Sequence, residues 1–366
     1  MAADAHSVNL RWILVEDEAA PETLFPVGGL VERHVGTGEY RGLEFLHVNA
    51  KRVINVVPAS SRMPFGHTIN AYRGCSMACS YCFARPTHEY LGLNTGEDWD
   101  RRIVVKVNAV ERVRAEVRAP RWGGHHIAMG TNTDPYQKAE GKYHLTQGII
   151  RVLGEAANPF SILTKSTLVL RDLDVLTAAA ARTSVRLNFS IGTLDRGVWR
   201  LTEPGTPPPD RRVEAVRRLN EAGIPCGVLI APILPGLSDG DDQLREVVEA
   251  CVGAGAVSIS AIALHLRPGV REHYLAWLAA ARPDLVELYS QRFTGRAGPR
   301  AYQPKAIQAD LASRVQQLVR AAEGRYDGPR QVRGVRVVEA AAGAELGPGR
   351  GAAPGAPAEA EQLQLL

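Results

Sequence analysis

Residues 74–83 read GCSMACSYCF and place Cys75, Cys79 and Cys82 in a C-x3-C-x2-C spacing. Three of the chain's five cysteines therefore lie within eight positions. Thiolate is a soft ligand that suits zinc or an iron–sulfur cluster. A closed structural zinc site takes four protein ligands, and no fourth cysteine lies nearby. A [4Fe–4S] cluster held by three thiolates instead leaves one iron open, so the spacing favours a cluster that binds a further molecule.

Two alternatives to such a cluster stay open at this point. A zinc site of the Cys3His type could use His67 or His88 as its fourth ligand. Alternatively, two of the thiols could be structural and the third unused. The rest of the chain has to decide between the cluster and these two alternatives.

Length and composition indicate an ordinary globular protein. The chain has 366 residues, 45% of them hydrophobic and 22% charged, which suffices for one large core or two modest ones. No apolar run approaches the ~18–20 residues of a membrane helix. The first residues, MAADAHSVNLRW, lack the features of a signal peptide. Few, clustered cysteines argue against a disulfide framework and predict a reducing, cytoplasmic location.

The charge balance is mildly basic, with a formal net charge of +4 and a pI of about 8.8. Such a balance permits nucleic-acid binding but fits a solvated surface equally well. The densest basic segment is 101–121, with seven Lys or Arg against two Glu. Within it, Asn108 and Glu111 match a capping box, which predicts a helix with exposed arginines. A nucleic-acid contact is the alternative for this segment.

Apolar runs of strand length alternate with helical patterns from residue 66 onward. This alternation predicts an α/β fold built from six strand–helix units with parallel strands. The expected strands are 66–70, 126–130, 160–165, 184–191, 225–231 and 256–264, and the expected helices are 145–157, 172–182, 210–222, 239–253 and 270–281. Alternation alone does not distinguish a doubly wound sheet from a barrel.

The segments around this central region divide the chain further. Residues 1–60 are expected to form an N-terminal extension with short strands, and 61–282 the main domain. Residues 283–339 contain two more helical patterns, near 284–292 and 305–323, which predict a helical cover. Residues 340–366, rich in Ala, Gly and Pro, are expected to be a disordered tail.

Polar residues follow several predicted strands, at the strand ends where α/β proteins place their sites. Residues 130–137 read GTNTDPYQ and offer Thr131, Asn132, Thr133 and Asp134 as candidates to bind a zwitterion, although a plain turn is the alternative. Lys165 ends the third strand and Ser190 the fourth. A lysine at this position supplies a point cation, and a serine supplies a hydroxyl.

Taken together, NAYRGCSMACSYCFAR, GTNTDPYQ, TKSTLVLRDLD, SIGTLD, EPGTPPPDRR and APILPGLSD resemble the radical S-adenosylmethionine (SAM) superfamily. Within it the chain is most similar to the spore photolyase-like branch, in an actinobacterial-type form, over about residues 60–270. The resemblance implies an open (β/α)6 partial barrel and two cofactors, a [4Fe–4S] cluster and SAM. The cluster of such proteins cleaves SAM reductively to a 5′-deoxyadenosyl radical, which abstracts hydrogen from a substrate.

The resemblance also assigns roles to residues. Cys75, Cys79 and Cys82 would hold the cluster and carry catalysis. A second set is expected to bind SAM: Tyr81, Phe83, Thr131, Asn132, Thr133, Asp134, Lys165 and Ser190. A flavodoxin or ferredoxin would supply the electron, and nucleic acid is a possible substrate.

One departure from the branch concerns its chemistry. Spore photolyase returns hydrogen through a cysteine near the position of Gly130 or Thr131, yet no cysteine occurs between Cys82 and Cys226. It also has a tyrosine where this chain has Phe83. We therefore expect radical generation to be preserved and photoproduct repair to be absent or rebuilt.

Two rival classes fit parts of the sequence. A non-catalytic iron–sulfur or zinc protein could bind nucleic acid through segment 101–121. An electron-transfer protein should offer four cysteines for its cluster, and this chain does not. The remaining cysteines, Cys226 and Cys251, are predicted to be small buried hydrophobes.

Overall fold

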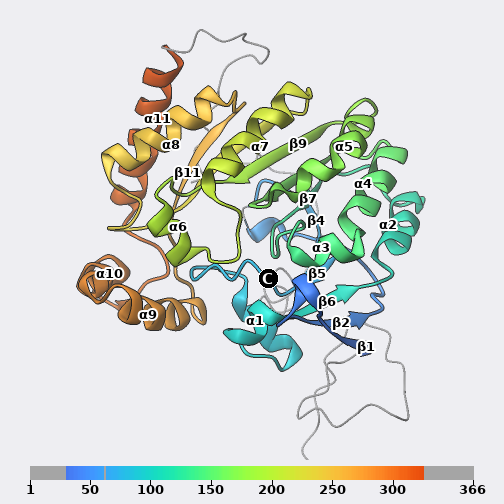
Figure 1. Cartoon of the computed structure of the whole chain (residues 1–366), viewed down its shortest axis with the longest axis horizontal. Coiled ribbons are helices and arrows are strands. Elements are labelled where there is room, and N and C mark those ends of the chain that lie inside the picture. Colours follow the sequence, from blue (N-terminus) through green and yellow to red (C-terminus); the bar gives the residue numbers. More distant parts are fainter. Residues whose placement is uncertain (1–29, 62, 325–366) are drawn as a thin grey trace, which may run out of the picture.

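The computed structural model describes residues 30–61 and 63–324, and its centre is a seven-stranded sheet with the order β11-β10-β9-β8-β7-β4-β3. Six strands are parallel neighbours in chain order, and β3 pairs antiparallel with β4 at one edge. The strands are β3 (Ile54–Val56), β4 (His67–Ile69), β7 (Ile127–Met129), β8 (Phe160–Thr164), β9 (Val185–Ser190), β10 (Cys226–Ile233) and β11 (Ile259–Ala263). Within the described residues β3 and β11 do not pair, so the sheet is an open, partial barrel (Figure 1).

One face of this sheet is fully buried and the other only in part, since Arg186 is exposed and Asn188 and Leu229 are half-buried on the second face. Leu187, Phe189, Val228, Ile230 and Ile259 are all fully buried. Helices connect successive strands on the outside, as Figure 1 shows for α4, α5, α7 and α8. The predicted fold class, an α/β fold with a partial (β/α)6 barrel, is confirmed.

A second, four-stranded sheet has the order β1-β2-β6-β5. Its strands are β1 (Leu30–Val35), β2 (Glu44–Val48), β5 (Tyr72–Arg73) and β6 (Arg102–Lys106). This sheet positions the three cysteines, because β5 leads directly into residues 74–83, the cysteine loop. Strands from the N-terminal extension and from the barrel region share both sheets, and the domain limits at 60, 282 and 339 stay predictions.

The helices agree with the sequence patterns to within a few residues where a pattern was recognised. The α-helices are α1 (Glu97–Arg101), α2 (Ala109–Arg118), α3 (Lys138–Tyr143), α4 (Leu145–Glu155), α5 (Leu173–Ala180), α6 (Arg196–Thr202), α7 (Pro209–Glu221), α8 (Asp241–Gly253), α9 (Val270–Ala281), α10 (Val286–Phe293) and α11 (Lys305–Glu323). Short 3-10 turns cover Gly38–Tyr40, Ala59–Ser61, Arg85–Leu91, Thr167–Asp172 and Pro283–Leu285, and β12 (Thr294–Gly295) pairs with β13 (Gly298–Pro299). The expected tail at 340–366 lies outside the described residues.

The C-terminal helices form the expected cover. α11 packs against α8 and β11 at the open edge of the barrel (Figure 1). None of the helices in the described part of the chain is both long and apolar enough to cross a membrane.

Segment 101–121 contains a strand and a helix, where a helix surface was predicted. Its first part is strand β6 rather than helix, because Arg102–Lys106 pairs with β2 and β5. The helix predicted from Asn108 and Glu111 is confirmed as α2, with Asn108 at its N-cap, but the capping-box hydrogen bond does not form. The Asn108 side chain instead bonds the backbone N and O of Ala50 at 2.9 and 3.0 Å. Arg114 pairs with Glu155 at 2.6 Å. Polar side chains of this segment therefore form contacts within the protein itself.

Candidate active site

The cysteine loop begins where β5 ends, at Gly74. Cys75 and Cys79 are buried, Cys82 is half-buried, and all three are free thiols. Burial raises the pKa of Cys75 to about 12 and also raises the pKa of Cys82, which the Arg85 guanidinium partly offsets. Such buried thiols ionise when a metal binds them.

Side chains from the segment after β7 hold the start of this loop. The Gly74 carbonyl accepts hydrogen bonds from Thr133 Oγ1 at 2.7 Å and from Gln137 Nε2 at 2.8 Å. Gln137 Oε1 in turn accepts from the Ser76 amide at 3.1 Å. Gly74 itself has φ +82°, a conformation that favours glycine. Thr133, one of the residues expected to bind SAM, therefore lies beside the cysteine loop, and its hydroxyl positions that loop.

A second segment, after α6, closes over the same loop. The Ser80 amide donates to Thr202 O at 3.0 Å, and the Gly205 amide donates to Met77 O at 3.0 Å. A Cβ on Gly205 would lie 2.2 Å from Ser76 O. Only glycine allows the two backbones to approach this closely.

Arg85 is almost fully buried and stabilises the cysteine loop through hydrogen bonds to its backbone. Its guanidinium donates to the Cys79 carbonyl at 3.0 and 3.2 Å and pairs with Asp100 at 2.8 Å. Sequence reasoning missed this residue, because an arginine three positions after the last cysteine has no distinctive spacing.

Glu203 is the centre of a buried charged network beside the cysteines. Its carboxylate accepts from the Tyr81 hydroxyl and from the Arg212 guanidinium. Burial opposes its ionisation, but Arg212, Lys165 and the Tyr81 hydroxyl together lower the pKa of Glu203 below its ordinary value. The group is therefore an ionised carboxylate with compensating partners.

Lys165 and Ser190 join this network from the ends of β8 and β9. Lys165 Nζ donates to Ser190 Oγ, lies 3.9 Å from Glu203 Oε1 and sits 5.7 Å from the centroid of the Tyr81 ring. Ser190 Oγ donates to Ala231 O at 2.7 Å. Three of the residues predicted to bind SAM thus meet at one place.

The remaining residues of the 131–134 segment have different surroundings. The Asp134 carboxylate accepts from Thr164 Oγ1 at 2.7 Å and from the Lys165 and Tyr136 amides at 2.7 and 2.9 Å. Asp134 therefore fastens the segment to β8, as the turn alternative predicts. Thr131 and Asn132 are half-buried.

Phe83 does not join the Lys165 network in the ring contacts of the described residues. It is 38% exposed, and its ring centroid lies 5.9 Å from that of His265, just beyond β11. His265 in turn stacks on Tyr302 at 5.5 Å, and Arg267 donates to the Tyr302 hydroxyl at 3.0 Å. Cys226 and Cys251 are buried, as predicted.

The donor set fits a cluster better than a zinc ion. Two thiolates on one tetrahedral zinc lie ~3.8 Å apart, whereas the Sγ atoms of the three cysteines are not all within 4.8 Å of one another. His88 bonds the Arg102 carbonyl at 3.0 Å, and His67 stacks on His125 at 4.8 Å. Neither histidine forms a close group with the cysteines among the described residues.

The donor and acceptor groups beside the cysteines also fit SAM. Asn132 Oδ1 is buried and has no hydrogen-bond partner in the described structure. An unsatisfied buried acceptor costs roughly 1–3 kcal/mol, so a donor from a ligand, such as the methionyl ammonium, fits this atom. Lys165 retains two further donor hydrogens for a carboxylate.

Glu203, Arg212 and Gln137 are the residues that sequence reasoning placed least well. Glu203 and Arg212 are the first and last residues of the stretch EPGTPPPDRR, which carried the resemblance but indicated no pairing. Gln137 ends GTNTDPYQ, and its four-residue spacing from Thr133 was the available signal, because both side chains reach Gly74.

Comparison with known proteins agrees with this geometry. The family profile of the radical SAM superfamily matches residues 69–249. An uncharacterized protein of Mycobacterium tuberculosis is 43% identical over 291 residues, which are 80% of this chain and 84% of that protein. An uncharacterized protein of Methanocaldococcus jannaschii is 31% identical over 199 residues, covering 54% of this chain and 70% of that protein.

Among solved structures, the spore photoproduct lyase complexed with dinucleoside spore photoproduct has a similar fold. It aligns with a TM-score of 0.54 and 20% identity over 77% of this chain and 79% of that chain. The profile match spans all but the first and last parts of the barrel and includes the three cysteines. The chain belongs to the radical SAM superfamily, and its cofactors are a [4Fe–4S] cluster and S-adenosylmethionine.

Proposed function

We propose that this chain is an enzyme that abstracts a hydrogen atom from a nucleic-acid substrate carrying an unstacked base. When bound, the cluster and SAM supply an electron and a 5′-deoxyadenosyl radical for that step. The proposal depends chiefly on one observation: Tyr81, Lys165 and Ser190 converge on Glu203 beside the cysteine loop.

The residues around Lys165 would hold its side chain in place for binding SAM. Ser190 and Glu203 fix the Lys165 ammonium, which would neutralise the SAM carboxylate. Arg212 keeps Glu203 ionised, and the Tyr81 hydroxyl occupies one of its oxygens. The buried loop around Cys79 would exclude water from the reacting centre.

A row of aromatic rings supports the choice of substrate. Phe83 follows Cys82, contacts His265, and leads through it to Tyr302, which is 48% exposed. Arg267 adds a cation at the end of this row. Bases of single-stranded nucleic acid stack on such rings for about 1–3 kcal/mol each, and arginine contacts phosphate.

We do not propose the hydrogen return of spore photolyase through a thiol near Gly130 or Thr131, because this chain has no cysteine between Cys82 and Cys226. Gly130 has φ +85°, and a Cβ there would lie 1.9 Å from Leu163 O. A cysteine at this position would collide with β8. We therefore propose that the substrate radical is resolved in another way, with a lyase or a transferase outcome both compatible with the site.

Anaerobic reconstitution tests catalysis. The purified protein should show a [4Fe–4S] spectrum that changes with SAM, and dithionite should produce 5′-deoxyadenosine. Cys79→Ala should abolish both signals. A colourless, zinc-loaded protein that binds nucleic acid would support the rival, a non-catalytic nucleic-acid-binding protein.

Labelled substrates test the substrate class. Single-stranded oligonucleotides deuterated in the sugar or base should transfer deuterium into 5′-deoxyadenosine, whereas deuterated peptides should not. Tyr302→Ala should weaken oligonucleotide binding by roughly 5- to 150-fold if one base stacks there. Tyr90→Ala, at a tyrosine of similar exposure outside the row, should not. Equal effects of both changes would contradict the assignment.

The cluster needs an electron donor and protection from oxygen in the cell. A flavodoxin or ferredoxin is the proposed electron donor, and the proposed location is the cytoplasm, where buried thiols and an oxygen-sensitive cluster are protected. Reduction of the cluster by a purified flavodoxin system, without dithionite, would support the donor.

A further inference from the structure

Glu32, His34 and His47 form a compact group outside the active site, on the sheet β1-β2-β6-β5. β1 and β2 are antiparallel, and Glu32 lies directly opposite His47 in their register. Residues two apart on a strand share a face, so His34 lies beside Glu32 on that same face. The strand pairing therefore brings together two imidazoles and a carboxylate.

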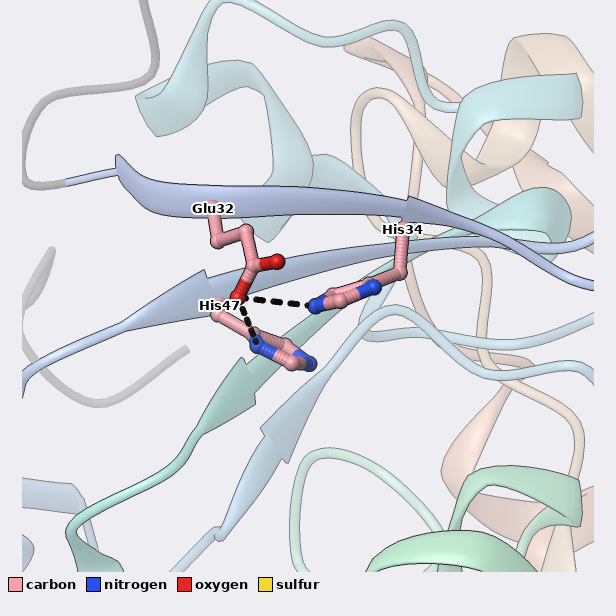
Figure 2. Close-up of side chains that lie close together, drawn as sticks. All are labelled: Glu32, His34 and His47. Carbon is pink, nitrogen blue, oxygen red and sulfur yellow. Dashed lines mark ion pairs between the residues drawn. The ribbon is translucent and has the colours of Figure 1, made fainter.

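The ligand atoms converge in the way a metal requires. Glu32 Oε2 lies 2.9 Å from His34 Nε2 and 3.7 Å from His47 Nδ1 (Figure 2). All three ligand atoms lie within 4.8 Å of one another. Two ligands at 2.0–2.1 Å from a tetrahedral zinc are ~3.3 Å apart, so the two oxygen–nitrogen distances bracket the separation that zinc needs.

A neighbouring residue orients one of the imidazoles. His47 Nε2 lies 2.8 Å from the hydroxyl of Tyr143, at the end of α3. When Nε2–H donates to this hydroxyl, Nδ1 keeps a free lone pair directed at the group. Metal-binding histidines regularly use their second ring nitrogen in this way.

The other charges near the group are compatible with a cation. The Lys142 ammonium lies nearby, but it rests over the rings of Phe45 and Tyr143, at 5.2 and 5.4 Å from their centroids. The negative charge of Glu32 offsets it. Glu32 is 59% exposed and His34 36% exposed, so an ion can enter from solvent.

We propose that Glu32, His34 and His47 bind a divalent transition ion of the zinc class, with a water in the fourth position. Two histidines and one carboxylate are a ligand set that zinc uses. The ion would cross-link edge strand β1 to β2. Because β5 of the same sheet leads into the cysteine loop, the ion would stabilise the support of that loop.

The test uses the full-length protein with its cluster in place, so that the cysteines are occupied. Equilibrium dialysis against Zn²⁺ should find one equivalent bound, and Zn²⁺ should raise the Tm. His34→Ala should weaken binding by more than ~100-fold and abolish the Tm shift, while Tyr143→Phe should weaken it ~10- to 100-fold. The control His125→Ala, at an exposed histidine elsewhere, should bind as the unmodified protein does.

Co²⁺ identifies the ligands directly. In the difference spectrum against the cobalt-free protein, Co²⁺ bound at this site should give d–d absorption without thiolate-to-cobalt charge-transfer bands, and His34→Ala should remove it. The proposal is overturned if no equivalent binds, if His34→Ala binds Zn²⁺ as tightly as the unmodified protein, or if thiolate-to-cobalt bands appear in the difference spectrum. Absence of binding would leave 5′-deoxyadenosine production, and with it the proposed function, unaffected.

Discussion

Replacing Arg212 with methionine removes the main cation that faces Glu203 while keeping a side chain of similar length. Arg212 is 1% exposed and donates to Glu203, to Thr206 Oγ1, to Pro207 O at 2.9 Å and to Ser190 O at 3.1 Å. In the variant, Glu203 keeps the hydroxyls of Tyr81 and Thr206, the latter at 3.3 Å, and its nearest cation is Lys165 at 3.9 Å.

The expected loss in the free energy of unfolding follows from the burial of the Arg212–Glu203 ion pair. Removing one partner of a buried ion pair leaves an uncompensated charge and costs about 3–5 kcal/mol. The matched control is Arg196→Met, which breaks the Arg196–Asp210 pair at 3.1 Å, where both side chains are more than half exposed. Such surface pairs contribute about 0–1 kcal/mol.

Urea unfolding of both variants, followed by circular dichroism, measures the difference. The double variant Arg212→Met/Glu203→Gln should be less destabilised than the sum of its single changes by about 1 kcal/mol or more, because a neutral amide in place of the carboxylate no longer needs the cation. If Arg212→Met lowers the free energy of unfolding no more than Arg196→Met does, Glu203 is not a buried ion, and the reasoning fails.

Three further predictions concern Lys165, Gly130 and His265. Lys165→Met should weaken SAM binding by roughly 10- to 150-fold, the loss of one charge-assisted hydrogen bond, while the cluster spectrum stays intact; unchanged dialysis affinity would remove Lys165 from the SAM site. Gly130→Ala should lower the free energy of unfolding by more than the ~1–2 kcal/mol of a left-handed alanine, because its Cβ would overlap Leu163 O, whereas Gly223→Ala, with φ +78° but open space around it, should show the backbone effect alone. Burial lowers the pKa of His265 to about 4 from 6.5; below pH 6.5 the unfolded chain therefore gains a proton that the folded chain does not, and stability should fall between about pH 6.5 and 4. His265→Gln should show a smaller loss over this window in urea titrations, and an identical loss would contradict the assignment.

Much of the fold was predictable because it depends on local patterns. The strands at 160–164 and 226–233 were recognised from short apolar runs, which are typical of largely buried strands. Strand β6 was missed because its sequence, RIVVK, lies between basic segments that resemble a helix surface. Asn108 is the N-cap of α2 as predicted, but its side chain bonds the backbone of Ala50 instead of the helix, because a capping side chain also has tertiary partners available.

The sequence by itself predicted the three cysteines as cluster ligands and an α/β fold, because three thiols within eight positions and a strand–helix alternation are properties of neighbouring residues. The partial barrel and the cofactors followed from the family resemblance of the motifs. Only the tertiary structure decided which side chains meet. Tyr81 and Glu203 are separated by 122 positions, and Glu32 faces His47 through strand register alone. Contacts of this kind arise from how strands pair and close on one another, and no local spacing encodes them.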